Sequence, residues 1–233
     1  MTLSIFCSCN NSSTNETTTS PIDSNVTDTT TIINQTTNDS TFTKDEEDVD
    51  AITTINFKEL SISINRFKIF DEDKKIEQIQ KDTVEIYAEL GETIEDQLIS
   101  ISSDKLTGLT VEQRYETSVT IMNEGPHCDL TDWKHFYSDW NKLQANSKGQ
   151  FKCDKYTEKE NEKFPKISIN ELKQEVKEKC GDEWLKLIEN IKTPTEYPSG
   201  VSISRYYLRI TGQRKDNGQT VTKLIVIETP MGC

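Results

Sequence analysis

The segments VSISRYYLRI (residues 201–210) and TVTKLIVIE (residues 220–228) decide the fold of this chain of 233 residues. Both are rich in β-branched and aromatic side chains, which favour strands. The polar loop between them contains Asn217-Gly218, a pair that favours turns because both residues tolerate positive φ. We therefore predict a C-terminal β-hairpin, extended or bulged because its loop is longer than two residues.

Alternating apolar residues predict three further strands upstream of this hairpin. Residues 60–64 and residues 84–90 each place every second side chain on one apolar face. The longest alternating run covers residues 109–121 and ends before a Gly-Pro pair, which breaks strands. Residues 94–102 fit a helical turn and a strand equally well.

The first alternating run changes parity after Asn65, because Phe67 and Ile69 fall on the opposite face of a regular strand. A β-bulge adds one residue to a strand and so reverses the parity of the residues after it. We therefore expect a bulge near Asn65-Arg66 that returns Phe67 and Ile69 to the core.

An aromatic stripe predicts a helix that begins after Thr131, a suitable N-cap. Large apolar residues follow at helical spacing, namely Trp133, Phe136, Tyr137, Trp140 and Leu143. Such a stripe binds sugars or stacks on bases in some proteins, but more often it packs against a sheet, since large aromatics dominate core burial. The candidate binding residues on this stripe are Trp133, Tyr137 and Trp140.

A second helical region begins at Ser168, which forms a capping-box pattern with Glu171. Apolar residues then line one helical face as far as Ile191, and Pro194 ends the region. Gly181 is expected to bend the helix or to divide it in two.

The order of these elements predicts an α+β fold over residues 51–233. We expect one antiparallel sheet of four to five strands, with two helical segments inserted before the C-terminal hairpin. The helices are expected to cover one face of the sheet.

The N-terminal segment contains the apolar residues 3–6 followed by Cys7-Ser8-Cys9. This pattern resembles the lipobox of bacterial lipoproteins, and the resemblance covers about ten residues. It implies that residues 1–9 are the remnant of a signal and that the Cys9 thiol carries a lipid after cleavage. The alternative is that Cys7 and Cys9 are incidental thiols.

Residues 10–50 are rich in Asn, Ser, Thr and Asp. Counted over residues 1–50, the chain has nine acidic side chains and one basic side chain. Such a segment buries too little apolar surface to offset the entropy of ordering it, so we predict a disordered, acidic tether. Its N-x-S/T triplets begin at Asn10, Asn11, Asn15, Asn25, Asn34 and Asn38. They would carry glycans in a secreted eukaryotic protein, but the composition produces such triplets by chance.

The formal net charge of the chain is −13. No basic stripe is present that could neutralise phosphates, so binding to nucleic acid is not expected. The charge instead favours a basic protein as the partner, and the predicted lipid places the domain on a membrane.

Four cysteines lie in the predicted domain, namely Cys128, Cys153, Cys180 and Cys233. In an exported protein four cysteines suggest two disulfides. We predict the pairs Cys128–Cys153 and Cys180–Cys233. In a reducing compartment the same residues would be buried thiols.

The chain contains no recognisable catalytic or metal-binding motif. Its two histidines, His127 and His135, lack the spacing of zinc ligands, and no Gly-rich phosphate loop is present. We therefore predict no catalytic residues, no metal and no cofactor. Carboxylates are abundant, so a carboxylate-dependent hydrolase is the alternative function.

The sequence thus favours a lipoprotein of the bacterial cell envelope with a non-enzymatic, protein-binding domain, such as an inhibitor or immunity-type protein. The domain would face the periplasm or the cell exterior. The alternatives are an exported hydrolase and a secreted glycoprotein on a glycan-bearing stalk.

Overall fold

The computed structural model describes residues 52–70 and 75–231 of the chain. These residues belong to one compact unit, which spans residues 45–233. The predictions for Cys7, Cys9 and the tether of residues 10–50 lie outside the described residues.

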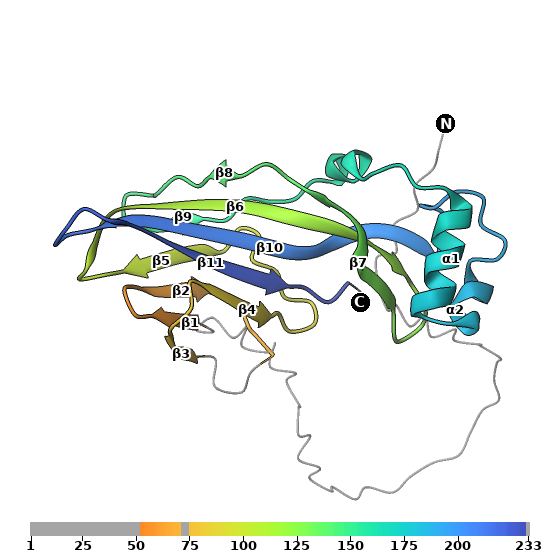
Figure 1. Cartoon of the computed structure of the whole chain (residues 1–233), viewed down its shortest axis with the longest axis horizontal. Coiled ribbons are helices and arrows are strands. Elements are labelled where there is room, and N and C mark those ends of the chain that lie inside the picture. The colour runs from red at the N-terminus through yellow and green to blue at the C-terminus, as the bar shows by residue number, and fades with distance from the viewer. Residues whose placement is uncertain (1–51, 71–74, 232–233) are drawn as a thin grey trace, which may run out of the picture. The chain divides into compact units, whose positions relative to one another are not determined.

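The predicted α+β class is wrong, because the described part of the chain is mostly β, with eleven strands and two short α-helices. The strands form two sheets instead of one (Figure 1). Neither sheet is wholly antiparallel, since each carries one parallel edge strand. The prediction failed because the aromatic stripe is a strand and because several short strands lack a clear alternating pattern.

The larger sheet has the strand order β4-β11-β10-β6-β7, with β8 paired to β6 on one side, and is called the large sheet below. Its strands are β4 (Thr83–Tyr87), β6 (Leu106–Ile121), β7 (Cys128–Tyr137), β8 (Asn141–Lys142), β10 (Ser199–Arg214) and β11 (Thr220–Glu228). The hairpin of β10 and β11 is antiparallel, which confirms the predicted hairpin. The long strand predicted at residues 109–121 is confirmed as β6.

The smaller sheet has the order β3-β1-β2-β5-β9 and is called the small sheet below. Its strands are β1 (Ile52–Phe57), β2 (Ser61–Asn65), β3 (Lys75–Ile79), β5 (Leu98–Ser102) and β9 (Phe151–Lys152). The ambiguous residues 94–102 therefore end in a strand. Phe67 and Ile69 are buried as predicted, but Arg66 with φ 49° redirects the chain in place of a β-bulge.

The main core lies between the two sheets. Fully buried side chains come from the small sheet, such as Ile62 and Ile64, and from the large sheet, such as Leu208 and Ile225. Strand alternation explains this, because every second residue of each strand points to the same face. One face of the large sheet is thus covered by the small sheet.

The two helices form a second core at one end of the same face (Figure 1). Helix α1 (Ile169–Lys179) buries Leu172 and Val176 against the end of β6. Helix α2 (Asp182–Leu187) follows Gly181, whose φ of 95° separates the two helices. The capping box of Ser168 and Glu171 and the division at Gly181 are both confirmed.

The helix predicted after Thr131 is wrong, because this segment is strand β7. Leu130 pairs with Val119 and His135 pairs with Ser118, so residues 131–134 are extra residues on β7. These extra residues interrupt the two-residue alternation of the strand. As a result, the large side chains of this segment are three or four residues apart, which is also the spacing of a helix face. The Lys134 ammonium donates to the Glu171 carboxylate at 2.7 Å, which links the insertion to α1.

Candidate binding face

The face of the large sheet that points away from the small sheet is polar and aromatic. On β6 the core side chains alternate with Glu112, Arg114 and Glu116, and on β10 with Arg205, Tyr207 and Arg209. In the register of the sheet these residues form three cross-strand pairs, Glu112 with Arg209, Arg114 with Tyr207, and Glu116 with Arg205. Tyr137 lies beside Glu116 on β7. These seven residues are called the outward face below.

Arg114 is held among three aromatic rings at the centre of this face. Its guanidinium carbon lies 4.7 Å from the ring centroids of Tyr137, Trp140 and Tyr207. Each such contact is worth about 0.5–2 kcal/mol, depending on how far it is shielded from water. The Nε atom is buried and has no hydrogen-bond partner among the described residues. The guanidinium therefore has aromatic neighbours but no counter-ion in the described part of the chain.

Arg209 shares the Trp140 ring with Arg114. Its guanidinium carbon lies 4.1 Å from the ring centroid, and its Nε atom donates to the Glu112 carboxylate at 2.8 Å. A paired and an unpaired guanidinium thus both contact Trp140. These two contacts hold the indole, which lies in the loop between β7 and β8, against the arginines of the outward face.

Glu116 is a fully buried carboxylate beside Arg114 on the same strand. The Arg205 guanidinium lies 3.4 Å from it, His135 Nδ1 lies 3.6 Å from it, and the Tyr207 hydroxyl donates a short hydrogen bond to it. Burial and the neighbouring Glu116 carboxylate raise the pKa of Tyr207, so its hydroxyl stays a neutral donor. The Glu116 charge is satisfied inside this network and is not free for chemistry.

The structure brings together two of the three candidate binding residues. Tyr137 and Trp140 both contact Arg114, although they lie on a strand and the loop after it and not on one helix face. Trp133 lies apart from them, in the extra residues of β7, and packs against the helical core. Arg114 and Tyr207 were not predicted from the sequence. Both stand at positions that alternate with the core positions of a long strand, and this alternation could have indicated that they share the outer face.

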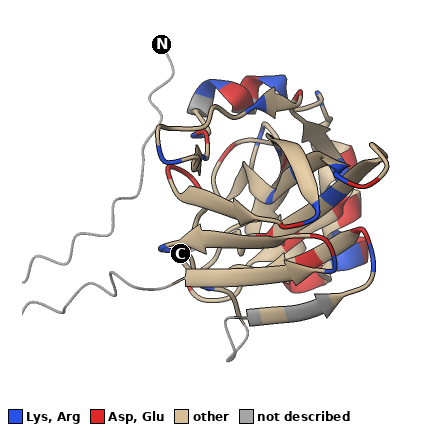
Figure 2. Ribbon diagram, turned by 90° about the vertical axis from the view of Figure 1, so that its left-hand side faces the viewer, with Lys and Arg blue, Asp and Glu red and all other residues tan. Residues whose placement is uncertain are grey.

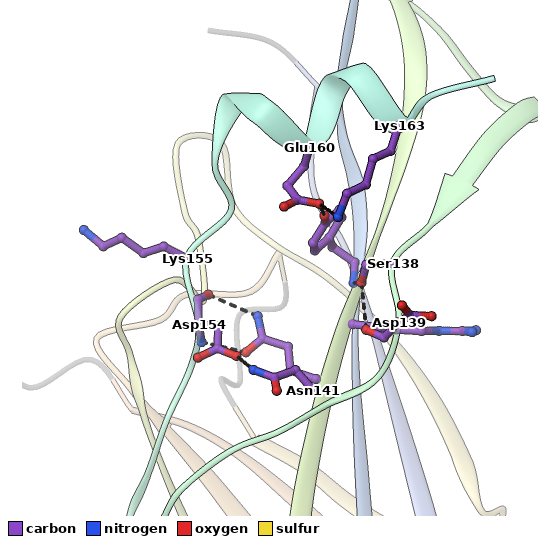
Figure 3. A pocket seen from close by; sticks show the side chains of 10 residues that line it. Ser138, Asp139, Asn141, Asp154, Lys155, Glu160 and Lys163 are labelled. Carbon is purple, nitrogen blue, oxygen red and sulfur yellow. Dashed lines mark hydrogen bonds and ion pairs between the residues drawn. The ribbon is translucent and has the colours of Figure 1, made fainter. Parts of the chain in front are cut away.

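A cavity of about 390 Å³ lies beside this face, near the 3-10 helix η1 (Glu158–Lys163) (Figure 3). The residues that line it are Gln113, Arg114, Tyr115, Ser138, Asp139, Asn141, Asp154, Lys155, Glu160 and Lys163. In Figure 3 Glu160 and Lys163 point toward each other from η1, whereas Lys155 points away from the other labelled side chains.

Two of the three carboxylates that line this cavity, those of Glu160 and Asp154, are occupied by internal contacts. Glu160 accepts hydrogen bonds from the Tyr115 hydroxyl and from the Lys163 ammonium, which holds the pKa of its carboxyl below the ordinary value. Asp154 accepts a short hydrogen bond from the Asn141 amide. A general acid for glycoside hydrolysis needs a raised pKa. Glu160 is therefore unsuited to that role.

Burial does raise the pKa of the Asp129 carboxyl, which also accepts a hydrogen bond from the Thr120 hydroxyl at 2.5 Å. Asp129 lies on β7 and does not line the cavity. The raised pKa and the cavity therefore occur at different places, and together they make no acid–base pair.

The structure contains a disulfide, as predicted, but it joins Cys128 to Cys180 with their Cα atoms 6.1 Å apart. The predicted pairs Cys128–Cys153 and Cys180–Cys233 are therefore wrong, and Cys233 itself lies outside the described residues. Cys128 begins β7 and Cys180 caps α1, which packs on β7, whereas Cys153 lies in the core between the sheets. The spacing of the cysteines along the sequence does not show that Cys128 and Cys180 lie close together in the fold.

Cys153 is a buried free thiol. Burial, together with the neighbouring Asp154 carboxylate, raises its pKa to about 12. The thiolate is the nucleophilic form of cysteine. At neutral pH Cys153 is therefore a protonated core residue and not a nucleophile.

Within residues 52–70 and 75–231, no three His, Cys, Asp or Glu side chains are grouped so as to hold a metal ion.

The described helices include none with both the length and the apolar character needed to cross a membrane. Acidic and basic residues are intermixed along the ribbon in Figure 2.

The chain matches no protein-family model, no curated protein and no solved structure.

Proposed function

We propose that this chain is a non-enzymatic protein-binding domain and that the outward face is its binding surface. The observation that carries the proposal is the cluster of Arg114, Tyr137, Trp140 and Tyr207 on the sheet face opposite the small sheet, where Tyr137 is exposed although Tyr207 is buried. Arginine, tyrosine and tryptophan are the residue types that dominate binding energy at protein interfaces. Here they are also held rigidly by one another, which lowers the entropy cost of binding.

The charge of the chain supports a basic protein as the partner. The formal net charge is −13, and such a field speeds the approach of an oppositely charged protein. An inhibitor or immunity-type protein that neutralises a basic toxin fits this combination of net charge and a face with an arginine held among aromatic rings.

We propose further that the domain is exported and held at the bacterial cell envelope by a lipid on Cys9. Two features support this location. Ser8-Cys9 follows a short apolar run in the manner of a lipobox. The Cys128–Cys180 disulfide is typical of proteins that fold in an oxidising compartment.

The binding proposal is tested by photo-crosslinking in the natural host. A photoreactive phenylalanine replaces Tyr137, which lies on the outward face with 40% of its surface exposed. The matched control replaces Leu187 on α2, which is also 40% exposed. We expect Tyr137 to give one dominant protein adduct that the Leu187 position does not give. The same adduct from both positions, or none from Tyr137, would contradict the proposal.

The location is tested by intact mass spectrometry of the chain from its natural host. We expect a chain that begins at an acylated Cys9. An unmodified chain that retains residues before Cys9 would contradict the lipid anchor. Glycans on the Asn triplets of residues 10–40 would favour the secreted glycoprotein instead.

A further inference from the structure

Arg114 differs from the other arginines that lie on the large sheet. Arg205 pairs with Glu116, Arg209 pairs with Glu112, and Arg214 pairs with Glu59. Arg114 has three aromatic rings around it and no carboxylate within ion-pair distance among the described residues. The sheet therefore holds one rigid guanidinium whose charge the described part of the chain does not neutralise.

Aromatic rings stabilise a cation without supplying acceptors for its hydrogen bonds. Arg114 is half-buried, and its Nε–H has no acceptor within the described part of the chain. A group that brings oxygen acceptors would bind the terminal NH2 groups of the guanidinium, because Nε itself is buried. Because the rings already fix the guanidinium, such a group would bind it with little loss of side-chain entropy.

We infer that Arg114 is the receptor for a single carboxylate, presented by the protein partner of the outward face; this inference rests on the proposed function. A carboxylate matches the edge of a guanidinium with two parallel hydrogen bonds. The carboxylate belongs to an Asp or Glu side chain or to a C-terminus of that partner.

The carboxylates near Arg114 favour a singly charged carboxylate over a phosphate as its ligand. Glu112 and Glu116 lie two residues to either side of Arg114 on β6, so both are on the same face. Each is paired with an arginine of β10, and Arg205 also pairs with Glu228 of β11 at 3.3 Å. None of these three carboxylates forms an ion pair with Arg114. A carboxylate brings one negative charge to this surface. A phosphate brings up to two, which Glu112, Glu116 and the negative chain repel more strongly.

The test is a titration of the isotope-labelled full chain with sodium acetate, followed by NMR at constant ionic strength. The indole N–H of Trp140 reports the site, because its ring contacts Arg114. We expect a saturable shift of this signal in the natural chain. A shift that grows linearly with acetate, or no shift, would overturn the inference.

Two variants of Arg114 assign the shift to its guanidinium. In Arg114→Gln we expect the acetate dissociation constant to rise about tenfold or more, the usual effect of losing a charge-assisted hydrogen bond. In Arg114→Lys, which keeps the charge but loses the planar fork, we expect an intermediate rise. The charge-matched control is Lys148→Gln in an exposed loop, which should stay within twofold of the natural chain. Arg114→Lys carries the test if Arg114→Gln does not give the amide spectrum of a folded chain.

Inorganic phosphate is the second probe in the same titration. Weaker binding of phosphate than of acetate supports a carboxylate receptor. Tighter binding of phosphate at Trp140 would overturn the assignment of the ligand class.

The inference and the proposed function fail in different ways. Saturable acetate binding without a specific Tyr137 adduct would contradict the protein-binding function. A Tyr137 adduct whose yield is unchanged in Arg114→Gln would keep that function and overturn the carboxylate contact.

Discussion

Reduction of the Cys128–Cys180 disulfide should remove a large part of the stability of the domain. The two cysteines are 52 residues apart in the sequence, so the bond closes a long loop in the unfolded chain. The chain-entropy relation for a loop of this length gives a stabilisation of about 4 kcal/mol at 25 °C. Small domains are stable by about 5–15 kcal/mol in total, so this loss is a substantial fraction.

The assay is urea-induced unfolding followed by tryptophan fluorescence, with and without a phosphine reductant. We expect the midpoint of unfolding to fall markedly on reduction, in proportion to the lost free energy. The control is the Cys128→Ala/Cys180→Ala double variant, whose unfolding should not respond to reductant. A natural chain whose free energy of unfolding changes by less than about 1 kcal/mol on reduction would refute the loop-entropy argument.

Three further predictions concern buried groups. Lys223 is 3% exposed and pairs with Glu59 at 2.8 Å. Lys223→Met should therefore lower the free energy of unfolding in urea by about 3 kcal/mol. This is the low end of the usual range for a broken buried pair, because Arg214 still pairs with Glu59. The exposed control Lys58→Met should cost less than about 0.5 kcal/mol, and equal losses would contradict the buried pair. The hydrogen bond from Lys223 lowers the pKa of Glu59, so this contact stabilises the fold above the unfolded carboxyl pKa of about 4.3 and is lost as pH falls through the folded pKa. An acid titration of stability should therefore be flatter in Lys223→Met than in the natural chain, and parallel curves would count against the pair. The thiol of Cys153, whose pKa is raised to about 12, should resist iodoacetamide in the folded chain and react only after unfolding. Peptide mass mapping measures this alkylation. Rapid alkylation of Cys153 in the folded chain would disprove its burial.

Most of the correct predictions about the fold came from the alternation of apolar and polar residues along the strands. The hairpin of β10 and β11 and the long strand β6 were predicted correctly, because each has many alternating residues and one buried face. Helix α1 was predicted correctly in its start, because Ser168 and Glu171 form a local signal that needs no tertiary contact.

The aromatic segment of β7 could not be assigned from its pattern. The extra residues 131–134 break the two-residue period, and the remaining spacing matches a helix. The disulfide was mispaired for a related reason. Cys128 and Cys180 meet only because α1 packs on β7, and the helix expected at residues 131–143 would have placed Cys128 elsewhere.

The candidate binding face was found only in part from the sequence. Tyr137 and Trp140 were predicted as members of an aromatic stripe on one helix face, and the structure places both at Arg114 although neither lies on a helix. Tyr207 is 93 positions after Arg114, and only the register between β6 and β10 makes them neighbours. A long-range register of this kind depends on which strands pair, which the alternating pattern of one strand does not contain.

The most direct measurement of the central claim is the affinity of the partner captured at Tyr137 for two alanine variants of the full chain. Tyr137→Ala removes a ring from the outward face, whereas Leu187→Ala removes an equally exposed side chain from α2. If the outward face is the binding surface, Tyr137→Ala should weaken binding about 30-fold, as expected for an interface hot spot of about 2 kcal/mol, and Leu187→Ala should change it less than about threefold. Equal effects of the two variants, or a larger loss in Leu187→Ala, would contradict the assignment of the binding surface.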